Sequence, residues 1–281
     1  MKRLIVCLLI LFFANALKAA TPVYIPDPNL KAAIEDELGV PNPTATDMLE
    51  LTYLRADSNG ISDLTGLETA LNLKRLRANL NLITILSPLF SLTKLEYLNL
   101  MDNNITNISS LQQLTKLKYL YLDRNDNISD INAISDMNNL AELGLVDVNL
   151  TTITPLADVN QIKYLYLGNH YNHIQDINSL RGYLKLVRLN LTYNNPLSIA
   201  SRCDYLQEIA ENNPTASITP NPANDVNTFS TDWIDLRIFV NWWLSQVCGT
   251  ANGYCSCADL DDNGKVGFSD YAIFAEMWMS I

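Results

Sequence analysis

The stretch Leu95-Glu96-Tyr97-Leu98-Asn99-Leu100 decides the fold, because the same leucine spacing returns 22 residues later as Leu117-Lys118-Tyr119-Leu120-Tyr121-Leu122. The full pattern reads L-x-x-L-x-L-x-x-N-x-I. Seven copies, 22 to 24 residues apart, begin at Leu51, Leu73, Leu95, Leu117, Leu140, Ile162 and Leu186. Repetition at this period indicates a solenoid, in which each coil contacts only its neighbours along the chain.

Each part of the repeat predicts a local structure. The L-x-x-L-x-L segment predicts a short strand, and the strands of successive copies stack into a parallel sheet about 4.8 Å apart. On the return leg apolar residues recur every third position, which favours 3₁₀ turns or extended coil over α-helix. The amides at the turn leaving the strand are expected to bond buried backbone groups; they are Asn59, Asn81, Asn103 and Asn194.

Some copies depart from the pattern. Ala56 and Ala78 replace the third leucine of the first two copies, and Val148 stands at the asparagine position of the fifth. Extra residues occur within 125–127 and within 170–172, where we expect the turn that leaves the strand to bulge.

These repeats resemble the leucine-rich repeat family, specifically the 22-residue bacterial type of internalin-like surface proteins. The resemblance implies an α/β fold, a leucine-rich-repeat solenoid with a parallel sheet on its concave face and helical caps at its ends. We therefore predict an N-terminal cap over 21–50, seven repeats over 51–198, and a C-terminal cap and linker over 199–222.

The two caps have their own sequence signals. An amphipathic helix is expected over 30–38, with Asn29 as its N-cap and Gly39 at its end. A second short helix is expected over 203–211, after the last repeat.

Alternation along each strand places the leucines inside and the residues between them on the exposed, concave face. That row is rich in Tyr and Arg and also contains Glu142. Tyr and Arg dominate protein interfaces, although tyrosine rings also stack on sugars and favour strands in general. The predicted ligand-binding residues are Tyr53, Arg55, Arg75, Arg77, Tyr97, Tyr119, Tyr121, Tyr164, Tyr166 and Arg188.

Composition limits the functional class. The 281 residues carry a formal net charge of −11, which argues against a nucleic-acid partner. Residues 1–20 combine a basic start, an apolar run and small residues, as in a signal peptide, and no later stretch is apolar enough to span a membrane. We expect a secreted or cell-surface protein. No catalytic constellation can be assembled from the sequence, so we predict no enzyme.

Export makes disulfides possible among the four cysteines that follow residue 20. Cys248 could pair with Cys255 or Cys257, and we favour Cys255. A zinc site is a weaker alternative, and Cys203 could be a small buried apolar residue.

The segment 223–281 contains a calcium-loop pattern. Oxygen side chains stand at loop positions 1, 3, 5 and 12, Gly264 permits the sharp turn, and position 7 supplies a backbone carbonyl. The predicted Ca²⁺ ligands are Asp259, Asp261, Asn263, Lys265 and Asp270. Aspartate at position 12 and a degenerate upstream copy around Asp235 resemble a dockerin module, which implies an all-α fold and a cohesin-like scaffold as partner.

Together these features predict a non-catalytic recognition protein that binds a protein ligand on its concave face and is tethered by a calcium-dependent dockerin-like module. Two alternatives stay open. One is a free surface adhesin, and the other is a glycan-binding accessory subunit of an extracellular polysaccharide-degrading complex.

We expect that substitution of Asp259 or Asp270 abolishes stabilisation by calcium, because an ion that binds only the folded module raises its free energy of unfolding. Melting temperatures in calcium and in chelator measure this effect. An unsubstituted chain that melts identically in both conditions would refute the calcium site.

Overall fold

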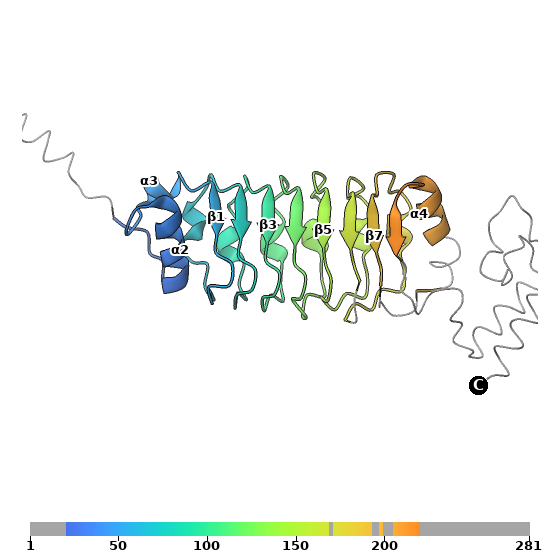
Figure 1. Cartoon of the computed structure of the whole chain (residues 1–281), viewed down its shortest axis with the longest axis horizontal. Coiled ribbons are helices and arrows are strands. Elements are labelled where there is room, and N and C mark those ends of the chain that lie inside the picture. The colour runs from blue at the N-terminus through green and yellow to red at the C-terminus, as the bar shows by residue number, and fades with distance from the viewer. Residues whose placement is uncertain (1–20, 169–170, 193–196, 199–204, 220–281) are drawn as a thin grey trace, which may run out of the picture.

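The computed structural model describes residues 21–168, 171–192, 197–198 and 205–219, and shows the strands side by side in a single row (Figure 1). All pairs are parallel, and strand order follows chain order. The strands of the described part are β1 (Tyr53–Arg55), β2 (Arg75–Arg77), β3 (Tyr97–Asn99), β4 (Tyr119–Tyr121), β5 (Glu142–Gly144), β6 (Tyr164–Tyr166), β7 (Arg188–Asn190) and β8 (Ser217–Thr219). The predicted leucine-rich-repeat solenoid is thereby confirmed for this part of the chain.

Short 3₁₀ helices occupy the return legs, as the three-residue apolar period predicts, and lie behind the strands in Figure 1. Their bounds are η1 (Leu67–Thr69), η2 (Ser87–Leu89), η3 (Ser109–Leu111), η4 (Asn132–Ile134), η5 (Thr154–Leu156) and η6 (Asn178–Leu180). The core lies between strands and return legs, where the central strand leucines, such as Leu98 and Leu120, are fully buried. Ala56 and Ala78 are buried in place of the leucines that they replace.

A column of asparagine side chains connects neighbouring coils at the turn after each strand. The Nδ2 group of Asn103 donates to the carbonyl of Leu100 in its own coil and to that of Ala78 in the preceding coil, each at 3.0 Å. Its Oδ1 accepts the N–H of Ile83, also at 3.0 Å. Asn81 bonds the coils before it in the same way. The predicted role of these two amides is confirmed.

Three predictions about this column need correction or extension. Asn59 is exposed and only its backbone N–H reaches Asn81, because no repeat precedes it. Asn125 and Asn172, which fall within the predicted insertions, are fully buried members of the column. The extra residues therefore lie after Asn125 and before Asn172, and the column itself is not displaced. Asn194 lies outside the described residues.

The N-terminal cap consists of α2 (Pro28–Leu38) and α3 (Ala45–Met48). The N-cap of α2 is Asp27, and the prediction of Asn29 was wrong; the Asp27 carboxylate accepts the N–H groups of Asn29 and Leu30. Its second oxygen accepts the N–H of Ser62 at 2.8 Å, which ties the cap to the first coil. Burial acts to raise the pKa of Asp27, but these N–H donors outweigh it and lower the pKa.

Gly39 ends α2 in the left-handed conformation, with φ of 66°, as expected of a glycine at this position. At the other end of the solenoid, α4 (Leu206–Asn212) matches the described part of the predicted second helix. The sheet then continues into β8, whose Ile218 pairs with Leu189. This strand lies in the segment predicted as cap and linker, and it was missed because Ser217-Ile218-Thr219 has no leucine pattern.

We expect Asn103→Ala to lower the free energy of unfolding by about 2–4 kcal/mol, because it leaves buried N–H and C=O groups of two coils without a partner. The neighbouring Asn104 is exposed, so Asn104→Ala should change stability by less than about 0.5 kcal/mol. Urea denaturation of both variants checks the difference. Equal stabilities would contradict the structural role of the column.

Candidate functional site: the strand face

All ten predicted ligand-binding residues lie on the outward side of β1–β4, β6 and β7, which we call the strand face. They form two columns on either side of the central leucines. The first column is Tyr53, Arg75, Tyr97, Tyr119, Glu142, Tyr164 and Arg188, and the second is Arg55, Arg77, Asn99, Tyr121, Gly144, Tyr166 and Asn190. The parallel register brings residues 22 to 24 positions apart in sequence side by side.

At the N-terminal end of the strand face the arginines are already paired. The Asp57 carboxylate lies 3.2 Å from Nε of Arg55 and 2.9 Å from Nη2 of Arg77. Only 11% of the Asp57 side chain is exposed, and its single negative charge offsets one of the two positive charges of these arginines. This end of the face therefore offers less positive charge than the sequence indicates.

An aromatic cluster occupies the middle of the strand face. The ring centroid of Tyr97 lies 5.9 Å from that of Tyr119 and 5.7 Å from that of Tyr121. The guanidinium carbon of Arg75 lies 4.8 Å from the Tyr97 ring centroid, within the range of a cation–π interaction. These contacts hold large side chains in place on an open surface, which lowers the entropy cost of using them to bind a partner.

Strand β5 interrupts the aromatic pattern. It contributes Glu142 and Gly144 where both neighbouring strands contribute a pair of tyrosines. Burial raises the pKa of the Tyr121 hydroxyl, and its hydrogen bond to the Glu142 carboxylate raises it further. Burial and the negative charge of Glu142 also raise the pKa of Tyr166. Glu142 is therefore electrostatically coupled to a tyrosine on each side.

Gly144 makes room for a buried carboxylate. A Cβ atom at this position would lie 2.3 Å from Oδ2 of Asp123, which no real contact tolerates. Asp123 is 6% exposed, its Oδ1 accepts the N–H of Val146 at 3.0 Å, and burial raises its pKa. The sequence analysis missed the role of Gly144; the available signal was a glycine at a strand position where other copies carry Tyr, Arg or Asn.

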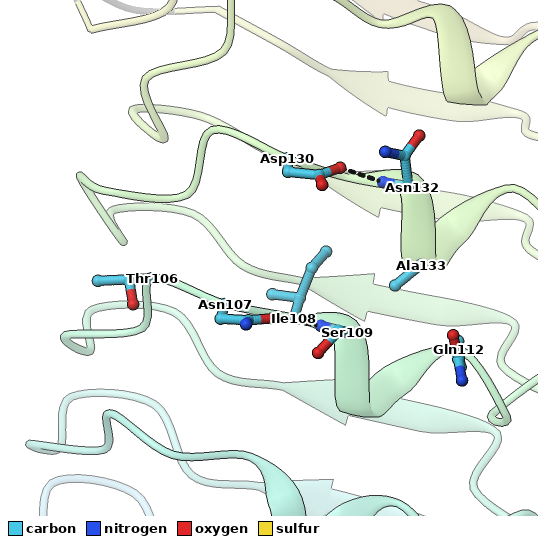
Figure 2. Close-up of a pocket in the computed structure, with 8 residues that line it drawn as sticks. All are labelled: Thr106, Asn107, Ile108, Ser109, Gln112, Asp130, Asn132 and Ala133. Atoms are coloured by element: carbon cyan, nitrogen blue, oxygen red, sulfur yellow. Dashed lines mark hydrogen bonds between the residues drawn. The ribbon is translucent and has the colours of Figure 1, made fainter.

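Two of the pockets that the described residues form lie away from the strand face. Figure 2 shows the first, about 340 Å³ in volume, between the return legs of two successive coils; Asp130 accepts the N–H of Asn132 there at 2.8 Å. Its lining combines polar side chains with Ile108 and Ala133 and contains a single ionisable side chain, Asp130. The second, of about 400 Å³, lies at the turn edge, where Asp102 holds Arg124 in an ion pair. We assign no ligand to either.

Within the described ranges, no group of three or more His, Cys, Asp or Glu side chains could hold a metal ion. The predicted calcium ligands Asp259, Asp261, Asn263, Lys265 and Asp270, and the cysteines of the predicted disulfide, lie outside those ranges. No helix of the described residues is long and apolar enough to cross a membrane.

We expect Gly144→Ala to destabilise the fold by about 1–3 kcal/mol, because the added methyl group overlaps the Asp123 carboxylate. Gly182→Ala is the matched control, since a Cβ there meets no atom within 4 Å, and it should be nearly neutral. In the double variant that combines Gly144→Ala with Asp123→Ser, most of the destabilisation should disappear, because the overlapping carboxylate is gone. Thermal melts of Gly144→Ala, Gly182→Ala, Asp123→Ser and the double variant test this. If the effects of Gly144→Ala and Asp123→Ser simply add in the double variant, the proposed overlap is disproved.

Known proteins share the repeat and the architecture. Residues 93–136 match the family model for leucine-rich repeats (2 copies). The structure of internalin C2 from Listeria monocytogenes is 28% identical, with a TM-score of 0.63, over 72% of this chain and 88% of that one. The internalin InlF of the same organism is 22% identical, with a TM-score of 0.49, over 73% and 79%. No curated protein sequence matches the chain.

The family model and the similarity to internalin C2 agree with the repeat period, the parallel sheet and the 3₁₀ return legs. The chain thus contains leucine-rich repeats and is similar in structure to internalin C2.

Proposed function

We propose that this chain is a secreted, non-catalytic recognition protein that binds a protein ligand through its strand face. The observation that carries the proposal is the ordered cluster of Arg75, Tyr97, Tyr119 and Tyr121 on an otherwise open sheet. Tyrosine and arginine side chains fixed by their neighbours are the usual centres of binding energy in protein interfaces. The internalin-like fold supports a protein ligand, since proteins of this type generally bind proteins.

Tethering by the segment 223–281 is the second part of the proposal. Its support is the calcium-loop spacing from Asp259 to Asp270 and the resemblance to dockerin modules, which dock onto cohesin-like scaffolds. Secretion rests on the signal-peptide pattern of residues 1–20. In this arrangement the solenoid captures a ligand and the C-terminal segment holds the assembly outside the cell.

A comparison of two surface variants tests the binding face. The triple variant Tyr97→Ser, Tyr119→Ser and Tyr121→Ser removes the aromatic cluster. The control variant Leu82→Ser, Ile85→Ser and Phe90→Ser removes three exposed apolar side chains outside the strand face, which are 56%, 65% and 48% exposed. We expect the first variant to retain less than about a tenth of the ligand captured by the parent chain, since interface aromatics dominate binding, and the second to retain nearly all of it.

The capture uses the immobilised full chain and extracellular proteins of candidate partner cells, in calcium and in chelator, with amounts measured by mass spectrometry. Equal capture by the parent and the tyrosine variant would refute the proposed face. A glycan array, probed in parallel, tests the alternative ligand class. Glycan binding that depends on the tyrosines, without protein capture, would show that the ligand is a glycan and not a protein.

The comparison of calcium with chelator tests the segment 223–281. Proteins captured only in calcium, by the parent and the tyrosine variant alike, would be candidate partners of that segment.

A further inference from the structure

We propose that the N-terminal end of the strand face binds an acidic segment of the protein ligand, through the carboxylates of aspartate or glutamate side chains. The site, which we call the arginine patch, consists of Arg55, Arg75 and Arg77. The inference rests on the proposed function, because it specifies which ligand chemistry one part of the same face would recognise.

The parallel register gathers the three arginines on two neighbouring strands. Arg55 of β1 is the register partner of Arg77 of β2, and Arg75 lies two residues before Arg77 on the same strand. At the backbone, neighbouring strands are about 4.8 Å apart, and alternate residues of one strand are about 6.6 Å apart. The three arginine side chains therefore leave the sheet from one small area of its outward side.

The patch keeps a positive charge after its ion pairs are counted. The Asp57 carboxylate pairs with Arg55 and Arg77, and among the described residues no other carboxylate is within ion-pair distance of the three arginines. Three positive charges and one negative charge leave two positive charges in excess. The whole chain has a formal net charge of −11, so the patch has the opposite sign to the chain as a whole.

The arginines are more accessible than the carboxylate that pairs with two of them. The side chains of Arg55 and Arg77 are 65% and 36% exposed, whereas that of Asp57 is 11% exposed. Arg75 is also exposed, and in the part of the chain that the structure describes its guanidinium forms no ion pair or hydrogen bond. This guanidinium lies over the ring of Tyr97, and a stacked guanidinium can still donate its N–H groups to a carboxylate.

These features favour an acidic ligand over the other classes of side chain. A basic side chain would be repelled by the excess positive charge. An apolar side chain would remove water from the guanidinium groups without replacing its hydrogen bonds. A carboxylate offsets the charge and accepts two parallel hydrogen bonds from one guanidinium.

The spacing of the arginines indicates how the acidic residues of the ligand are arranged. In an extended segment, side chains at alternate positions lie on one face, about 6.6 Å apart. Arg75 and Arg77 have the same separation at the backbone, because they too are alternate residues of a strand. We therefore expect two acidic residues that are separated by one residue to bind best.

Short peptides test the charge and the spacing separately. The full chain is labelled with ¹⁵N-arginine, and the Nε–H signals of the patch are assigned from Arg55→Lys, Arg75→Lys and Arg77→Lys. We expect acetyl-Ala-Glu-Ala-Glu-Ala-amide to shift these signals saturably at about 0.15 M salt, where exposed charges are screened beyond about 8 Å. The analogue with glutamine in place of glutamate should not shift them. The peptide acetyl-Ala-Glu-Glu-Ala-Ala-amide has the same charge and should bind more weakly, because its carboxylates point to opposite sides of an extended chain.

Two substitutions should change the affinity in opposite directions. Arg75→Gln should weaken binding of the alternating glutamate peptide about tenfold, as expected for the loss of a charged hydrogen-bond donor. Asp57→Asn should strengthen binding about threefold, because it removes the negative charge that competes for Arg55 and Arg77. The gain in affinity keeps the test decisive if Arg75→Gln fails to fold. Affinities are measured from the patch signals that remain in each variant.

Arg181→Gln is the matched control. Arg181 follows η6 on a return leg, and its guanidinium carbon lies 5.0 Å from the ring centroid of Tyr205. The substitution therefore removes the same charge and the same kind of cation–π contact from another part of the surface, and it should leave peptide binding unchanged. Melting temperatures show whether each variant is folded.

Three results would overturn the arginine patch. They are equal shifts with the glutamate and glutamine peptides, equal affinity for the two glutamate peptides, and unchanged affinity in folded Arg75→Gln or Asp57→Asn. Inorganic sulfate or a sulfated disaccharide that binds as tightly as the alternating glutamate peptide would also overturn it, since the patch would then bind any anion.

The proposed function is tested independently of these results. If the peptides fail and the tyrosine triple variant still loses its captured ligand, the proposed function stands without the arginine patch. If the alternating glutamate peptide binds as expected and the triple variant captures as much ligand as the parent, the patch is supported and the tyrosine cluster is rejected as the centre of binding.

Discussion

Each coil from β1 to β5 turns sharply at the end of its strand, and backbone groups at that turn face the core and not water. Those N–H and C=O groups must be bonded within the protein, because a buried polar group without a partner costs free energy comparable to a lost hydrogen bond. The asparagine column meets this requirement by bonding each coil to the previous one, as Asn103 does with Ala78 and Ile83. Coil spacing, strand register and the alignment of the strand face all depend on it.

The column tolerates change where the backbone supplies another partner. Val148 brings no amide to the fifth coil, and there the N–H of Ile128 donates instead to the carbonyl of Asn125, at 3.1 Å. Asn172 stands two residues later in the chain than the repeat predicts, yet its Nδ2 group still reaches the carbonyls of Leu145 and Leu167. At the C-terminal end Asn213 plays a comparable part, bonding Tyr183, Leu186 and Ile209. The solenoid therefore preserves the hydrogen bonds rather than the spacing.

A regular scaffold of this kind leaves the outward strand positions free to vary. The strand face changes character along the solenoid, from arginines paired with Asp57, through the cluster around Tyr97, to the Glu142 and Gly144 interruption. Each region is composed of residues from neighbouring coils that the register aligns. A ligand lying across several strands would thus meet different chemistry in each region, which is how a repeat protein with a uniform core can acquire a specific surface.

The sequence determined the fold of the described part almost completely. The leucine period predicts the strands, the three-residue apolar period predicts the 3₁₀ legs, and alternation predicts which residues face outward, because all three follow from local backbone geometry. The membership of Asn125 and Asn172 in the column could not be predicted in this way, because the insertions shift the asparagine position of these two copies. Strand β8 was missed for a similar reason, since it forms by pairing with β7 and not by its own pattern.

The candidate site, like the fold, was predicted from the sequence only in part. The sequence alone placed ten Tyr and Arg side chains on one face, because their positions repeat with the leucines. Only the tertiary structure decided which of them contact one another. The pairing of Arg77 with Asp57, the ring contacts around Tyr97, and the packing of the Asp123 carboxylate against Gly144 are contacts between different coils. Their geometry depends on how side chains from separate repeats pack, and no single repeat contains that information.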